Sequence, residues 1–255
     1  MSRQFRTSVE AGIGEVVIDS PPVNALDSEG WRALAREIDR LNADDTVRVI
    51  VIRAEGKGFC AGVDIKELQA HPDRIVEVNA GNYETFRALH RGLKPAIAAV
   101  HGYVLGGGIG ICGAVDIILA SPDARFGVPE VDRGALGAGA HLQRMFPLQK
   151  VRQMYFTGDS IDAAEAWRLG AVEKVVPRGE LRAAAIALAA KIAAKSPAIV
   201  RLAKEALNGV EDGDLERHYR WEQGFTAQAY LTAESQEARD AFVEKRDADF
   251  SGKKN

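Results

Sequence analysis

Along the first half of the chain, segments with the hydrophobic pattern of strands alternate with segments that have the pattern of helices. Residues 4–10 and 14–20 are short β-rich runs separated by Ala-Gly-Ile-Gly, which predicts a hairpin. Residues 28–42, with Asp27 as the N-cap, and residues 73–92 have helical patterns. Near-continuous apolar runs, typical of buried strands, occupy residues 47–55, 95–105 and 115–121. Strands that alternate with helices predict an α/β domain with substantial parallel sheet.

The second half of the chain is mostly helical in pattern. An alanine-rich helix begins after Pro177, and Ser196-Pro197 begins another, which two more helices follow. This last block has no obvious core of its own, so it must pack on the α/β body or on a neighbouring subunit. We therefore divide the chain into an α/β core, residues 1–195, and a C-terminal helical region, residues 196–255.

Composition narrows the possible classes of function. The 255 residues are 46% hydrophobic and 27% charged, as in ordinary globular proteins, and the net charge of −3 argues against general nucleic-acid binding. Cys60 and Cys112 have no metal-ligand spacing, so we expect no metal site and no disulfide framework. No secretory signal and no membrane span are indicated, and we expect a cytoplasmic protein.

Two glycine-rich loops each follow a predicted strand. One is Gly-Lys-Gly-Phe-Cys-Ala-Gly at residues 56–62, and the other is Gly-Gly-Gly-Ile-Gly at residues 106–110. The second loop matches neither the phosphate-loop motif nor the dinucleotide fingerprint. Each loop alone is as consistent with a tight turn or close packing as with a site. Together, each can offer one backbone N–H to a shared carbonyl oxygen and so form an oxyanion hole.

Five segments, in this order, resemble the crotonase (enoyl-CoA hydratase/isomerase) superfamily. They are PPVNAL (21–26), GFCAGVDIKE (58–67), KPAIAAVHGYVLGGG (94–108), FGVPE (126–130) and AFVEKR (241–246). The resemblance runs almost end to end. It implies a core of repeated ββα units arranged as a superhelix, a C-terminal helical trimerisation region, and a homotrimer or dimer of trimers. It also implies an acyl-CoA thioester substrate, in which coenzyme A is part of the substrate and no separate cofactor is needed.

The same resemblance assigns residues to the site by position. The oxyanion hole falls to the N–H groups of Val63 and Gly107. Other matched positions are expected to bind coenzyme A. Ala61, Asp64 and Ile65 match the segment that contacts its adenine, and Lys245 matches a residue that reaches its phosphates, often across a subunit boundary.

The chain departs from the hydratase pattern at two positions. Hydratases of this family carry two glutamates; the second is present as Glu130, whereas the first position is Gly110. His141 stands where hydratases have threonine, at the start of a helix expected to border the pocket. Glu130 and His141 are therefore the candidate bases for activating water. Residues 221–230 are expected to pack or to contact another subunit, and the alternative is that Glu222 or Gln223 reaches the acyl pocket.

These departures favour one reaction within the family and leave others open. GVDIKE, GGGIG, PEV-x-RGALGA and His-Leu-x-Arg resemble actinobacterial enzymes that open a ring late in steroid degradation. We therefore expect hydrolysis of a carbon–carbon bond in a cyclic β-keto acyl-CoA. The alternatives are a 2-enoyl-CoA hydratase or isomerase with a single glutamate, and a non-enzymatic acyl-CoA-binding relative.

Overall fold

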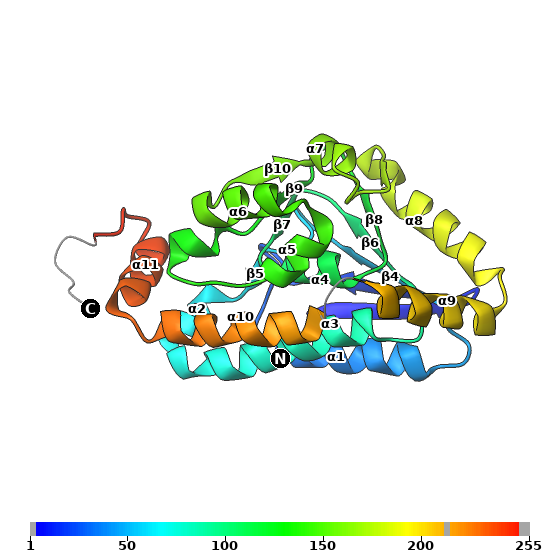
Figure 1. The fold of residues 1–255 in the computed structure, drawn as a ribbon, viewed down its shortest axis with the longest axis horizontal. Coiled ribbons are helices and arrows are strands. Elements are labelled where there is room, and N and C mark those ends of the chain that lie inside the picture. The colour runs from blue at the N-terminus through cyan, green and yellow to red at the C-terminus, as the bar shows by residue number, and fades with distance from the viewer. Residues whose placement is uncertain (1–3, 212–214, 250–255) are drawn as a thin grey trace.

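A six-stranded sheet forms the centre of the computed structural model, which describes residues 4–211 and 215–249 (Figure 1). The strand order is β1-β2-β4-β6-β8-β11, in which β1 and β2 form the predicted antiparallel hairpin and the other neighbours are parallel. The strands are β1 (Phe5–Glu10), β2 (Ile13–Ile18), β4 (Val49–Ala54), β6 (Ala96–Val100), β8 (Ile117–Ala120) and β11 (Lys174–Val175).

The central strands are buried on both faces, as their apolar runs predicted. On β4, Val49 and Val51 belong to a small core covered by helix α8 (Arg178–Ala193). Ile50 and Ile52 belong to the large core on the opposite face, beneath α1 (Ser28–Ala43) and α3 (Ile75–His90). Alternate residues thus supply two cores, which explains why the sequence shows a continuous apolar run rather than an alternating pattern.

Two smaller sheets lie beside the main sheet and include the strands next to the two glycine-rich loops. One has the order β10-β9-β7 and the other pairs β3 with β5 in parallel. Their strands are β3 (Ala25–Leu26), β5 (Gly62–Val63), β7 (Tyr103–Leu105), β9 (Arg125–Gly127) and β10 (Ser160–Asp162).

The prediction of a single strand over residues 95–105 is wrong. The chain leaves the main sheet after Val100 and begins β7 at Tyr103, with a turn at Gly102, whose φ is +55°. A Cβ atom at Gly102 would lie 2.1 Å from the carbonyl oxygen of Lys57, so only glycine fits. Apolar residues continue across the turn, and this hid the break from a reading of hydrophobicity alone.

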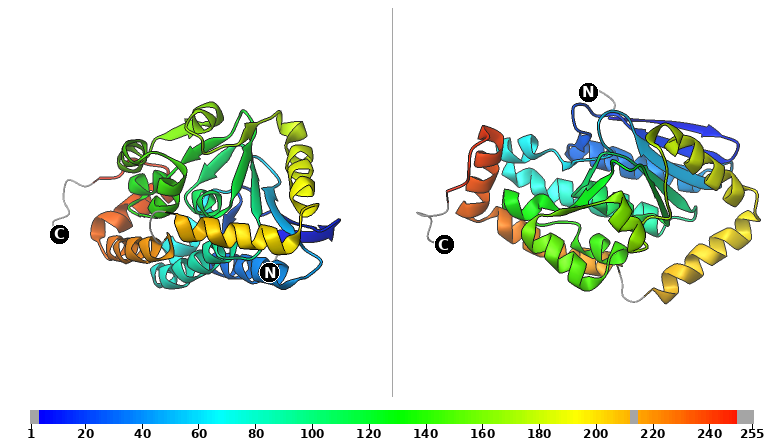
Figure 2. Two further views of the ribbon diagram at one scale, coloured as in Figure 1. Left: turned by 45° about the vertical axis from the view of Figure 1, so that its right-hand side comes forward. Right: turned by 90° about the horizontal axis from the view of Figure 1, so that it is seen from above.

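The remaining helices surround the sheets (Figures 1 and 2). They are α2 (Ile65–Ala70), the 3₁₀ turn η1 (Pro72–Arg74), α4 (Gly107–Ala114), η2 (Pro129–Arg133), α5 (Gly139–Met145), α6 (Leu148–Thr157), α7 (Ala163–Arg168), α9 (Pro197–Val210), α10 (Leu215–Tyr230) and α11 (Ala233–Glu244). Helix α10 packs on α3 and α5, and α11 packs on α2 and η2, so part of the C-terminal region closes over its own chain.

No single helix in the described ranges is long and apolar enough to cross a bilayer. Helices α8 and α9 meet the length and hydropathy criteria only when counted together, and the chain bends by 105° between them.

Candidate active site

The two glycine-rich loops meet above the buried ring of Trp31. Gly62 lies in β5, and Gly107 is the first residue of α4. A Cβ atom on Gly62 would lie 3.0 Å from the nitrogen of Gly107, and one on Gly107 would lie 2.5 Å from Cζ2 of Trp31. Neither loop can carry a side chain at its point of closest approach. The structure therefore brings together the two backbone segments that the sequence analysis paired.

Backbone hydrogen bonds hold the first loop in this position. The N–H of Asp64 donates to the carbonyl oxygen of Leu26 at 2.9 Å, and that of Leu105 donates to the carbonyl oxygen of Cys60 at 2.9 Å. The N–H of Gly62 lies 3.4 Å from Sγ of Cys60. Burial raises the pKa of the Cys60 thiol to about 12, so it is a packing group and not a nucleophile near neutral pH.

The second loop ends at a helix N-terminus that faces the first. Gly106 donates its N–H to the carbonyl oxygen of Gly127 at 3.2 Å and has φ of +50°. As the first residue of α4, Gly107 has an N–H that the helix itself does not use. The positive end of the helix dipole adds to the attraction for a negatively charged oxygen at this point. The arrangement suits an oxygen that gains charge during a reaction.

A small cavity of about 40 Å³ lies beside these loops. The polar groups around it come from separate elements, and the walls are mostly apolar. Residues lining it include Val63, Asn82, Phe86, Gly107, Glu130, the 135–138 loop, Tyr219, Thr226 and Tyr230. The space is large enough to hold water.

Glu130, in η2, presents its carboxyl group to this cavity. A Cβ atom at Gly106 would lie 2.0 Å from Oε1 of Glu130, which places the carboxyl against the second glycine loop. Oε2 is buried and has no hydrogen-bond partner in the described part of the chain. Burial raises the pKa of Glu130 to about 7, so the group can take up and release a proton near neutral pH.

Phe86 occupies the space in which the first hydratase glutamate would stand. Gly110 is buried in α4, and a Cβ atom there would lie 2.1 Å from Cζ of Phe86. The Phe86 ring packs edge-on against Trp31, with ring centroids 5.7 Å apart. The missing carboxylate is thus replaced by an aromatic layer, and Glu130 is the one carboxylate among the residues that line the cavity.

His141 does not lie where the sequence analysis expected it. The predicted helix start is correct, since His141 is the third residue of α5, but its side chain is not among those lining the cavity. The ring is buried behind Phe86 and Tyr219, at centroid distances of 4.6 and 4.9 Å. Burial lowers the pKa of His141 to about 3, which makes it a weak base.

The residues expected to bind coenzyme A lie along one flank of the molecule. Ala61 precedes β5, Asp64 caps α2 by accepting the N–H of Lys66 at 2.9 Å, and Ile65 begins that helix. Lys245 ends α11 and is exposed. Because α11 packs on α2, the helix that carries Lys245 meets the helix that begins at Ile65 within one chain. Their roles in binding stay predictions.

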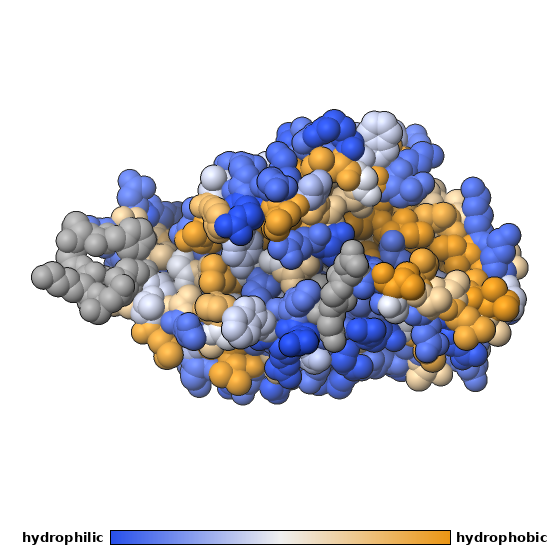
Figure 3. Space-filling view, in the orientation of Figure 1, coloured by the Kyte–Doolittle hydropathy of each residue, from blue (hydrophilic) through white to orange (hydrophobic). Residues whose placement is uncertain are grey.

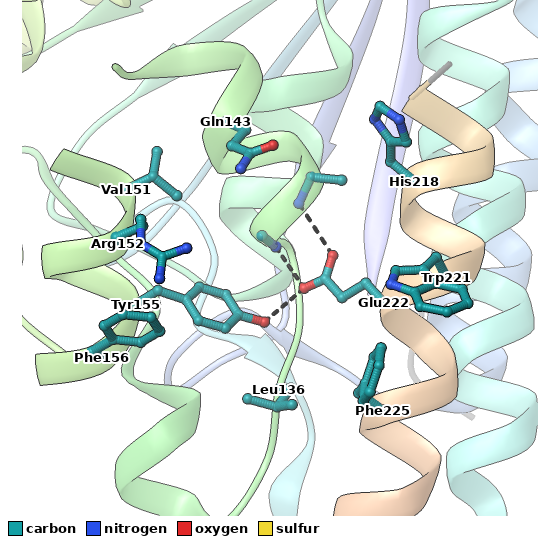
Figure 4. Close-up of a pocket in the computed structure, with 12 residues that line it drawn as sticks. Leu136, Gln143, Val151, Arg152, Tyr155, Phe156, His218, Trp221, Glu222 and Phe225 are labelled. Carbon is teal, nitrogen blue, oxygen red and sulfur yellow. Dashed lines mark hydrogen bonds between the residues drawn. The ribbon is translucent and has the colours of Figure 1, made fainter. Parts of the chain in front are cut away.

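Glu222 lies beside a second, larger cavity of about 420 Å³ (Figure 4). Its carboxylate accepts hydrogen bonds from the N–H groups of Gly139 at 2.6 Å and Ala140 at 3.1 Å and from the Tyr155 hydroxyl at 2.8 Å. Leu136 lines both cavities. Glu222 therefore fixes the start of α5, next to the loop that forms one wall of the catalytic cavity, rather than entering that cavity.

Comparison with known proteins places the chain in a family. Residues 8–253 match the enoyl-CoA hydratase/isomerase family model. A (7aS)-7a-methyl-1,5-dioxo-2,3,5,6,7,7a-hexahydro-1H-indene-carboxyl-CoA hydrolase of Mycobacterium tuberculosis is 46% identical, with 94% of this chain and 98% of that protein covered. The hydrolase of the same name from Rhodococcus jostii is also 46% identical, over 91% of each.

Solved structures agree with this assignment. An enoyl-CoA hydratase/isomerase from Xanthobacter autotrophicus superimposes with a TM-score of 0.86 at 26% identity, covering 94% of this chain and 91% of that one. The fold and the two glycine loops define a crotonase-type enzyme. The chain belongs to the enoyl-CoA hydratase/isomerase family.

Substitution of Gly107 tests the oxyanion hole. We expect Gly107→Ala to lower kcat/KM on order of 10²- to 10³-fold with any acyl-CoA that the wild type turns over, because the new methyl group meets Trp31 and displaces the N–H. Gly209→Ala on α9 is the matched control, since nothing lies within 4 Å of its Cβ position. Gly107→Pro removes the N–H outright, so equal activity of that variant and the wild type would exclude an oxyanion hole at this N–H.

Restoring the hydratase glutamate tests the role of Phe86. We expect Gly110→Glu to lower the free energy of unfolding by at least about 3 kcal/mol, because the side chain collides with Phe86 and buries a charge. Denaturant unfolding measures this change, and Gly179→Glu in open space on α8 is the control. A stable Gly110→Glu variant with fast crotonyl-CoA hydration would contradict this interpretation.

Proposed function

We propose that this protein opens the ring of a cyclic β-keto acyl-CoA by hydrolysing a carbon–carbon bond. The observation that carries the proposal is the buried Glu130 carboxyl, which has a pKa of about 7 and shares its cavity with Val63 and Gly107, while Phe86 takes the place of the first hydratase glutamate. Two relatives at 46% identity support it, since both are named as hydrolases of a dioxo-hexahydroindene-carboxyl-CoA, a fused-ring diketone joined to coenzyme A.

The reaction divides between Glu130 and the oxyanion hole. Ionised Glu130 takes a proton from water, whose oxygen attacks the ring ketone carbon. The bond between that carbon and the α-carbon of the thioester then breaks, and its electron pair forms a thioester enolate. The N–H groups of Val63 and Gly107 stabilise the enolate oxygen. Glu130 returns the proton to the α-carbon, and the single product is a ring-opened acyl-CoA that carries a new carboxylic acid where the ring ketone was.

The ionisation of Glu130 sets the expected pH dependence. Because the pKa of its carboxyl is raised by burial to about 7 and the base form reacts, kcat/KM should fall about tenfold per pH unit below about 7. Glu130→Gln should lower kcat on the order of 10²- to 10⁴-fold. Ring opening is followed by mass spectrometry as the gain of one water. A flat profile through pH 7, with an active Glu130→Gln variant, would contradict the role.

The alternative is a hydratase or isomerase that uses Glu130 alone. The oxyanion hole and one carboxylate would also serve that chemistry, so substrate comparison decides between them. A purified protein that leaves cyclic β-keto acyl-CoAs intact but hydrates crotonyl-CoA rapidly would overturn the hydrolase proposal.

We also propose that the chain assembles as a homotrimer or a dimer of trimers. Helix α9 supports this, because apolar side chains remain exposed along it and apolar atoms gather over α8 and α9 (Figure 3). The exposed large hydrophobic residues of α9 are Ile199, Leu202, Leu207 and Val210. A continuous apolar surface of this kind is typical of an interface between subunits.

Charge placed on this face should weaken assembly. We expect the double variant Leu202→Asp, Leu207→Asp to shift the mass measured by light scattering from an oligomer toward the monomer, because each side chain is about 60% exposed here and is expected to be buried between subunits. Arg201→Asp on the same helix is the control for added negative charge. A wild type that is monomeric at micromolar concentration would exclude the proposal.

A further inference from the structure

Two buried polar side chains line the cavity but take no part in the steps assigned to Glu130 and the oxyanion hole. Asn82 lies on α3 and is 6% exposed, and Tyr219 lies on α10 and is 4% exposed. Both line the cavity that also contains Val63, Gly107 and Glu130. The cavity therefore has polar groups beyond those that an oxyanion hole and one carboxylate provide.

The hydrogen-bonding capacity of Asn82 is incomplete. Its Oδ1 is buried and has no partner within the described ranges, as is also true of Oε2 of Glu130. Buried polar atoms in folded proteins nearly always have a partner, so two unpartnered oxygens in one small cavity indicate a polar ligand. An oxygen accepts hydrogen bonds, so the ligand must bring O–H or N–H groups, as water or a hydrated ketone does.

Tyr219 supplies the complementary donor. Its ring packs against the rings of Phe86 and His141, at centroid distances of 5.5 and 4.9 Å. The side-chain amides of Asn82 and Gln223 lie beside the phenol oxygen. A phenol oxygen that accepts from amide N–H groups keeps its own O–H proton for another acceptor. Since Tyr219 lines the cavity, that acceptor can be an oxygen of the substrate.

We propose that Tyr219 and Asn82 form a second carbonyl site, which binds the oxygen of the ring ketone that water attacks. This inference rests on the proposed function and adds to it the requirement for a second oxygen on the acyl group, β to the thioester carbonyl. Tyr219 donates to the ketone oxygen, and Oδ1 of Asn82 accepts from the hydroxyl formed when water adds.

The chemistry of ring opening explains why a second site is needed. Hydration of an enoyl-CoA develops negative charge at one oxygen, that of the thioester. Attack of water on a ketone places charge on the ketone oxygen first, and that charge passes through the breaking carbon–carbon bond to the thioester oxygen. A donor near the ketone oxygen stabilises the first of these states and selects substrates that carry it.

Ligand affinity tests the second site without relying on turnover. Calorimetric titrations in a Glu130→Gln background compare cyclohexanecarboxyl-CoA with its 2-oxo derivative. We expect Tyr219→Phe to weaken binding of the 2-oxo compound about 5- to 10-fold and to change binding of the other less than about twofold. Asn82→Leu should change the preference for the 2-oxo compound less than about twofold, because Oδ1 of Asn82 accepts only from the hydroxyl that forms when water adds. Tyr83→Phe on α3 is the control, since Tyr83 does not line the cavity.

The outcomes separate this inference from the proposed function. If Tyr219→Phe leaves the preference for the 2-oxo ligand unchanged, or weakens both ligands equally, the second carbonyl site is excluded. If the preference falls while the wild type fails to open any cyclic β-keto acyl-CoA, the site stands and the proposed reaction is wrong. Thermal unfolding of each variant confirms that it is folded before titration.

Discussion

The contact between two backbone segments that have no side chains determines most of this structure. Gly62 and Gly107 approach so closely that an added Cβ atom would strike backbone or the Trp31 ring. Each segment must therefore be brought to this point by its own small sheet, and those sheets must turn away from the main one, as the chain does at Gly102. The architecture around the sheet follows from placing two N–H groups side by side.

The C-terminal helices are part of the catalytic cavity as well as a cover for it. Tyr219, Thr226 and Tyr230 of α10 line the wall opposite the glycine loops. Thr226 donates to the carbonyl oxygen of Leu136 at 2.9 Å, and Glu222 holds the start of α5. Two helices of this region therefore have different roles. Helix α10 lines the cavity, whereas α9 exposes apolar side chains on the surface.

The fold was largely predictable because its signals are local. Buried runs, the Asp27 cap and the glycine loops each depend on neighbours in sequence, and the motifs placed Val63, Gly107 and Glu130 at one cavity. By contrast, the rotation of a helix about its own axis depends on packing against residues that are distant in the sequence. Asn82, Phe86 and Tyr219 sit on helices whose patterns do not show which residue faces the cavity, and the same uncertainty placed His141 on the wrong side of an aromatic layer.

Phe86 has a consequence for how such enzymes can diverge. A glutamate at position 110 meets the Phe86 ring, and removal of that ring alone leaves a hole between Trp31 and Tyr219. Each single step is unfavourable, although the two changes together restore a filled site. In this chain, a change toward the two-glutamate pattern therefore meets a stability barrier unless positions 86 and 110 change together.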